Sequence, residues 1–173
     1  MKRAILTVFC AMAAAPWGGC SRSIPTLTVE ELLANPEDHS HTIVKVRGCF
    51  VSEFEKAVLQ PCKGQNQGQN IWVEQAMAYE QINELGRNHP KFKGPAPVKL
   101  LFEYDKGREK RAWKALTASL GQKQMTSEIV LLGQFETIAP HAPGANEGFG
   151  QLGAYPHELI LVDVLSSESN TTR

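Results

Sequence analysis

The chain has 173 residues, of which 42% are hydrophobic, a length and composition that suit one domain with a packed core. Its 18 basic residues balance its 18 acidic ones. This balance excludes an overall electrostatic attraction to nucleic acid.

The first segment is typical of a bacterial export signal. Lys2 and Arg3 precede an apolar run over residues 4–15, and no acidic residue occurs before Glu30. The run is long enough for a signal-peptide core and too short to cross a bilayer as a helix. We therefore expect residues 1–19 to be a signal peptide that is removed. Two of the 18 basic residues and none of the 18 acidic ones leave with it, so the mature chain has a net charge near −2.

The sequence Gly18-Gly19-Cys20 resembles the end of a bacterial lipobox, in which the cysteine is lipidated and becomes the new N-terminus. Trp17 departs from the pattern, which prefers leucine three places before the cysteine. The resemblance implies lipidation of Cys20, a tether over residues 20–26 and a membrane anchor in the cell envelope. Ser21 favours the outer membrane, with the protein facing the periplasm. Ordinary secretion as a periplasmic or extracellular protein is the alternative.

Further along the chain, the spacing of Thr28 and Glu31 is that of a capping box and predicts a short helix, which Pro36 ends. Apolar and charged residues alternate over residues 41–51, which predicts a half-buried strand. The other predicted elements are strands 57–60 and 71–73, a helix over 75–85, a strand over 98–104, a helix over 108–120, and strands 128–137 and 158–165.

This order of elements predicts a mainly β fold with helices. We expect one small barrel of five to six strands over residues 27–165, similar to the oligonucleotide/oligosaccharide-binding (OB) barrel, with helices inserted after the third strand. Gly48 and Gly133 lie inside strand patterns, where a tightly coiled barrel often needs a bulge or bend. An α+β sandwich is the alternative. Residues 166–173 are polar and are expected to be disordered.

Two cysteines remain after Cys10 leaves with the signal and Cys20 takes the lipid. An even pair in an oxidising envelope predicts a disulfide between Cys49 and Cys62. A hairpin that turns around Glu55 and Lys56 would place the two cysteines opposite each other. A tighter turn at residues 52–53 would separate them by several residues.

The stretch from Gly148 to Gly153 fits the spacing G-x-G-x-x-G of dinucleotide-binding proteins. That motif needs a strand before it and a helix after it, whereas here a loop precedes it and a strand follows. We therefore predict no bound nucleotide and no cofactor. The glycines would instead let the chain turn tightly into the last strand.

The same loop resembles an uncharacterised family of small bacterial exported proteins, many of them lipoproteins with a barrel of this kind. The family often has Gly-His-x-Gly-x-Tyr before the final strand, which here is Gly150, Gln151, Gly153 and Tyr155, with glutamine where histidine is common. The resemblance extends to residues 48–55, 58–59, 71–72 and 130–135. It implies a binding loop at these four residues and no established activity.

Other candidate sites are weaker. His39 and His41, with Glu37 and Asp38 before them, could hold a metal ion, although a solvated turn explains them more simply, and we predict no metal. We find no nucleophile beside a recognisable base. Residues 87–114 contain nine basic and three acidic residues, which could grip a polyanion or an anionic lipid or could be the exposed face of a helix.

These observations predict a non-enzymatic lipoprotein that binds an unidentified protein or polymer of the envelope. No nucleic-acid partner is expected. One alternative is an exported metal-dependent enzyme that uses His39 or His41. A weaker one is a barrel that binds single-stranded nucleic acid.

Overall fold

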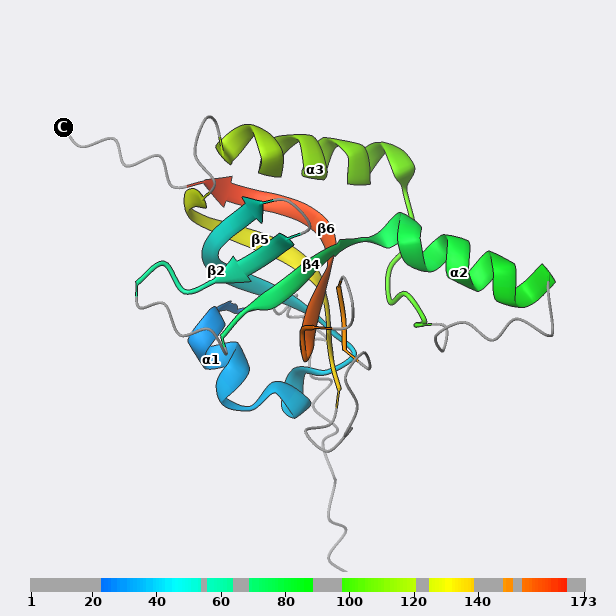
Figure 1. Cartoon of the computed structure of the whole chain (residues 1–173), viewed down its shortest axis with the longest axis horizontal. Helices are drawn as coiled ribbons and strands as arrows, with labels where there is room; N and C mark the ends of the chain where they lie inside the picture. The colour runs from blue at the N-terminus through cyan, green and yellow to red at the C-terminus, as the bar shows by residue number, and fades with distance from the viewer. Residues whose placement is uncertain are drawn as a thin grey trace, which may run out of the picture.

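The computed structural model describes residues 23–53, 56–63, 69–88, 98–120, 125–138, 148–150 and 154–167. The signal peptide and Cys20 predicted above lie outside these residues. The strands are β1 (Thr26–Thr28), β2 (Thr42–Glu53), β3 (Lys56–Gln60), β4 (Ile71–Gln75), β5 (Met125–Thr137) and β6 (His157–Ser167). The helices are α1 (Val29–Ala34), the 3₁₀ helix η1 (Pro36–His39), α2 (Ala76–Asn88) and α3 (Lys106–Leu120). Figure 1 shows their arrangement.

Five of these strands close into a barrel. They are hydrogen-bonded in the order β2-β3-β4-β6-β5, and β5 pairs again with β2. The β4–β6 pair is parallel, and the other pairs of the barrel are antiparallel. The short β1 adds a parallel strand beside residues 45–47 of β2. This small OB-like barrel with inserted helices confirms the predicted mainly β fold rather than the α+β sandwich.

The barrel depends on close approach of its strands at Gly133. A Cβ atom there would lie 2.7 Å from the carbonyl oxygen of Ile160 and 2.7 Å from the Leu159 side chain, both on the neighbouring strand β6. The register of β5 against β6 shifts between Leu132 and Gly133, which marks a bulge. Gly133, which the sequence predicts to lie at a bulge or bend, therefore lies at a bulge of β5.

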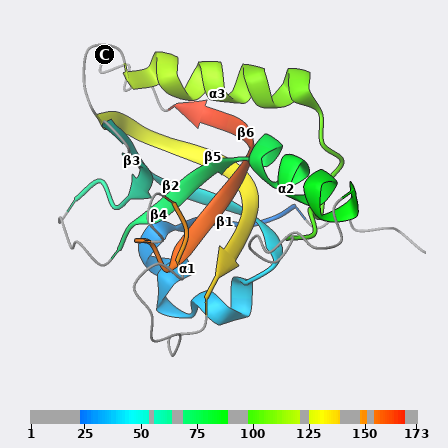
Figure 2. The same cartoon turned by 45° about the vertical axis from the view of Figure 1, so that its right-hand side comes forward.

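Two helices lie at opposite ends of the barrel (Figures 1 and 2). At one end, α3 buries Ala112 and Leu116 in the core, and Trp113 meets Phe50 edge to face with 6.3 Å between ring centroids. At the other end, α1 buries Val29 and Leu32. The predicted capping box of α1 is present: Glu31 N–H donates to Thr28 Oγ1, and Thr28 N–H donates to a Glu31 carboxylate oxygen.

The predicted strand over residues 98–104 is wrong. Alternate residues there are half-buried, as in a strand, but the segment belongs to no strand. Other boundaries shift by a few residues: β5 begins at Met125, α2 ends at Asn88, and β6 continues to Ser167, two residues into the predicted tail.

The disulfide between Cys49 and Cys62 is present, with 5.0 Å between the Cα atoms. The hairpin that precedes it has a register different from the one that would place the cysteines opposite each other. Cys49 pairs with Gln60, and the β2–β3 register runs from this pair to Glu53 opposite Lys56. Cys62 reaches back to Cys49 from two residues beyond the end of β3.

Candidate functional site

The outer face of β4, β6 and β5 has an unusual set of polar side chains. On each strand the alternate residues Val73, Leu159 and Phe135 point into the core. Because neighbouring side chains point to opposite faces of a strand, the residues between them point outward. Strand register places these outward residues in two rows, Trp72–Glu158–Glu136 and Glu74–Ile160–Gln134.

Glu158 lies at the centre of the first row and is 2% exposed. Tyr79, on α2, donates its hydroxyl hydrogen bond to a carboxylate oxygen of Glu158. Burial raises the pKa of Glu158 to about 8, helped by the nearby carboxylates of Glu74 and Glu136 and opposed by the Tyr79 hydrogen bond. The same burial, with the Glu158 carboxylate next to it, raises the pKa of the Tyr79 hydroxyl far above its usual range. Glu158 therefore holds a proton at neutral pH in much of the population.

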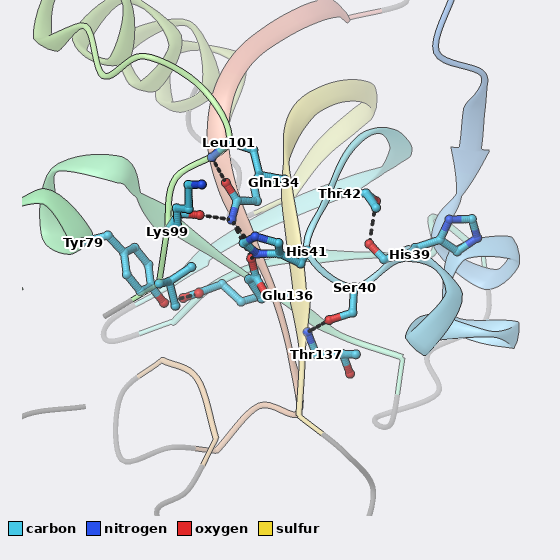
Figure 3. A network of polar contacts seen from close by, with 12 residues as sticks. His39, Ser40, His41, Thr42, Tyr79, Lys99, Leu101, Gln134, Glu136 and Thr137 are labelled. Carbon is cyan, nitrogen blue, oxygen red and sulfur yellow. Dashed lines mark hydrogen bonds and ion pairs between the residues drawn. The ribbon is translucent and has the colours of Figure 1, made fainter. Parts of the chain in front are cut away.

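At the β5 edge of the rows, Glu136 is held by two partners (Figure 3). Its Oε1 lies 2.9 Å from Nδ1 of His41 and accepts a hydrogen bond of 2.6 Å from Nε2 of Gln134. The first contact requires a proton on Nδ1 of His41, because a carboxylate only accepts. His41 has a φ of 56°, the left-handed region that non-glycine residues rarely adopt. Its side chain is 47% exposed, so Glu136 orients a half-exposed imidazole.

Gln134 also explains why residues 98–104 need no strand partner. Its Nε2 donates to the Lys99 carbonyl oxygen at 3.0 Å, and its Oε1 accepts from the Leu101 N–H at 2.7 Å. These are the two hydrogen bonds that a neighbouring strand would supply. One fully buried side-chain amide thus holds this segment over the outer face of the barrel (Figure 3).

The β4 edge of the rows is aromatic. The ring of Trp72 packs against Tyr155 with 5.3 Å between centroids, and its Nε1 donates to a carboxylate oxygen of Glu74 at 3.0 Å. Phe149 and Tyr155 exchange two backbone hydrogen bonds, which bring the chain back on itself just before β6. Glu53 lies near enough to Tyr155 to help burial raise the pKa of its hydroxyl. We call Glu53, Trp72, Glu74, Phe149 and Tyr155 the Trp72 surface.

Gly150 lets this loop lie on Trp72. Its φ is +70°, and a Cβ atom there would lie 2.6 Å from the Trp72 ring. The predicted binding loop is thus placed in part: Gly150 and Tyr155 lie on the Trp72 surface, whereas Gln151 and Gly153 lie outside the described residues. Sequence reasoning missed the roles of Trp72 and Glu158. The spacing that makes them neighbours is a parallel strand pairing, which leaves no local signal in the sequence.

The two histidines of the metal hypothesis are not brought together. His41 points toward Gln134 and Glu136, while the ring of His39 lies on the other side of the chain (Figure 3). Within the described part of the chain, no group of three His, Cys, Asp or Glu side chains could hold a metal ion.

A cleft of about 510 Å³ lies beside this face, at the end of the barrel where η1 packs. Thr137 and His157 form one wall, and residues 34–38 form the other. His157 stacks on Phe135, and its Nδ1 lies 2.8 Å from Thr137 Oγ1. Burial lowers the pKa of His157, which favours the neutral imidazole at neutral pH. The cleft has the size of a small-molecule site.

No protein-family model, no curated protein and no solved structure matches the chain. The resemblance to a family of exported proteins thus stays a prediction. None of the helices in the described ranges is long and apolar enough to cross a membrane.

Proposed function

We propose that the protein is a lipid-anchored, non-enzymatic binding module of the bacterial envelope, and that its Trp72 surface binds a neutral saccharide polymer. The observation that supports this proposal is the Trp72–Tyr155 ring pair, held on the outer face of β4 by Gly150. β3 and β4 are the second and third strands of the closed barrel, counted along the chain. OB barrels bind oligonucleotides and oligosaccharides at these positions.

The charge of the Trp72 surface favours the saccharide over the nucleic acid. Glu53 is exposed and Glu74 half-buried, and both lie beside the ring pair. Carboxylates next to the aromatic rings repel phosphate groups, whereas the exposed carboxylate of Glu53 can accept hydrogen bonds from sugar hydroxyls. Tyr155 is half-buried, so one of its edges is free for contact.

The anchored location rests on the sequence. A basic start, an apolar run and Gly18-Gly19-Cys20 support removal of residues 1–19 and lipidation of Cys20. Buried methylenes contribute about 0.8 kcal/mol each, so several acyl chains would hold the protein on the membrane. The disulfide is consistent with an oxidising compartment such as the periplasm. Membership of the exported family belongs to the same proposal.

The test is calorimetric titration of the purified mature protein with a hexamer of N-acetylglucosamine and, separately, with a 20-nucleotide thymidine oligomer. We expect the saccharide to bind. Tyr155→Ala should lower the affinity for the saccharide by about tenfold or more, because it removes one central anchor residue. Tyr104→Ala removes the same side chain from a different surface and is expected to leave binding unchanged. Binding of the oligonucleotide alone, or saccharide binding that Tyr155→Ala leaves intact, would refute the saccharide assignment.

A further inference from the structure

The first half of α3 concentrates positive charge on its exposed side. Its five exposed cations are Lys106, Arg108, Lys110, Arg111 and Lys114. The single acidic residue of the helix, Glu109, is 7% exposed and faces inward, where its carboxylate accepts hydrogen bonds from the Met77 N–H and the Tyr104 hydroxyl. Five of the nine basic residues of the stretch noted in the sequence therefore lie on the exposed side of this helix.

This placement opposes the helix's own electrostatics. Lys106 lies in the first turn, where the helix dipole is positive and cations are unfavourable. Lys106, Lys110 and Lys114 also follow one another at four-residue spacing, so each repels the next. Within the described residues no hydrogen bond or ion pair engages the ammonium groups of these three lysines, whereas the Arg108 guanidinium contacts Asp163 at 3.3 Å. We call the three residues the lysine stripe.

A recess opens beside the stripe. A cleft of about 220 Å³ is bounded by Lys106 and Lys110, and its floor includes Met77, Trp113 and Glu109. It is smaller than the usual range of small-molecule pockets and suits a single anchoring side chain. Methionine and an aromatic ring provide an adaptable apolar floor. The one carboxylate in the floor, that of Glu109, accepts a hydrogen bond on each of its two oxygens. With the ammonium groups of Lys106 and Lys110 at the rim, the cleft has two positive charges and one negative charge.

We propose that the lysine stripe and this cleft form a docking site for an acidic protein segment with one apolar anchor residue. Acidic side chains would pair with the lysines, which stand about 6 Å apart along the helix axis. The apolar residue between them would enter the cleft against Met77 and Trp113. A lipid surface or a nucleic acid would engage the cations but would leave the recess unfilled. The helix α3, which bears the lysine stripe, lies at one end of the barrel (Figures 1 and 2), and no residue of the stripe or of the cleft belongs to the Trp72 surface.

The proposal is tested with a fluorescein-labelled peptide that has glutamate at every fourth position and one phenylalanine between two of them. Fluorescence anisotropy with the purified mature protein is expected to show binding that weakens as salt is added, because exposed ion pairs are screened. Exchange of the phenylalanine for glycine is expected to weaken binding by about tenfold, the loss of one anchor residue.

The key variant combines Lys106→Gln, Lys110→Gln and Lys114→Gln. It is expected to lose about tenfold or more in affinity and to unfold at the same or a higher temperature, because repulsion within the helix is relieved. A control with Lys45→Gln, Lys63→Gln and Lys99→Gln makes the same change in net charge on other elements. It is expected to bind within about twofold of the unmodified protein.

Equal binding by the two triple variants would overturn the proposal, as would equal binding of the phenylalanine and glycine peptides. Stripe-dependent binding of phosphatidylglycerol vesicles or of a thymidine oligomer, without binding of the peptide, would assign the stripe to a different partner and overturn it as well. The saccharide titration uses neither the stripe nor this peptide, so the two proposals fail independently.

Discussion

Glu136 and Glu158 are direct cross-strand partners of β5 and β6, two glutamates on the same covered face of a small barrel. They are 9% and 2% exposed, respectively. Two charged carboxylates side by side would repel each other. In this protein the two side chains have different hydrogen-bond partners. Glu136 faces His41 and Gln134, whereas Glu158 faces the Tyr79 hydroxyl. Burial raises the pKa of Glu158 to about 8, so this carboxyl group keeps its proton at neutral pH in much of the population.

This difference predicts how Glu158 affects stability with pH. Its pKa rises from an ordinary 4.5 in the unfolded chain to about 8 in the fold, so the folded state binds the extra proton between these values. The contribution of Glu158 to stability is complete below about pH 4.5 and is lost as the pH rises through about 8. We expect Glu158→Gln to gain stability relative to the unmodified protein across this window, by up to about 1.4 kcal/mol per pH unit.

Urea unfolding at several pH values measures this difference. Glu30→Gln, a change on the exposed side of α1, serves as the control and should give parallel stability curves. A stability difference for Glu158→Gln that does not change between pH 5 and 8 would show that Glu158 is ionised in the fold.

Loss of the Gln134 side chain is expected to release the segment over residues 99–101. Gln134→Ala removes the partners of the Lys99 carbonyl and the Leu101 N–H and should destabilise the fold by about 1–3 kcal/mol. Hydrogen exchange at the Leu101 amide should become much faster, while the exchange of β2 amides stays slow. Gln60→Ala, which changes a half-buried glutamine of β3, is the matched control. Unchanged protection of Leu101 would contradict the role given to Gln134.

A methyl group at Gly150 is expected to displace the loop from Trp72. Gly150→Ala combines a positive φ with a Cβ atom 2.6 Å from the indole ring, so we expect a loss of about 1–2 kcal/mol and a red shift of Trp72 fluorescence. Gly107→Ala makes the same chemical change in the first turn of α3, where a Cβ atom would lie 3.1 Å from the exposed Asp105 carboxylate, so we expect stability to change by less than about 1 kcal/mol. Equal effects of the two substitutions on stability and on the emission spectrum would argue against the packing described for the loop.

Reduction of the disulfide is expected to weaken the fold without abolishing the barrel. Cys49 and Cys62 are 13 residues apart, and closing a loop of this length contributes about 3 kcal/mol. The double variant Cys49→Ala and Cys62→Ala should therefore unfold at a lower urea concentration and should no longer respond to reductant. Thiol labelling of the denatured, unreduced protein should find neither cysteine free; two reactive thiols would refute the bond.

The elements that the sequence predicts correctly are those with local causes. The capping box at Thr28 and Glu31 and the alternation of Val44 and Val46 with Lys45 act within a few residues. The segment over residues 98–104 has the alternation of a strand, yet its partner is the side chain of Gln134, which is more than 30 residues away. Periodicity reports which side of a segment is buried and does not identify what pairs with its backbone.

The site shows the same limit. Gly150 and Tyr155 stand out in the sequence because they belong to a glycine-rich loop, but their contact with Trp72 depends on the parallel pairing of β4 with β6. The disulfide is predicted from the number of cysteines, whereas the hairpin register differs by two residues, because Cys49 pairs with Gln60 and not with Cys62. Long-range register decides both geometries, and a single sequence gives no direct measure of it.

Mass spectrometry of the native protein from isolated membranes determines whether this barrel is a lipid-anchored module of the envelope. We expect a chain that begins at Cys20, with acyl groups on that residue and a bond between Cys49 and Cys62. A product that still has residues 1–19, or one whose Cys20 is unmodified, would contradict the anchored location.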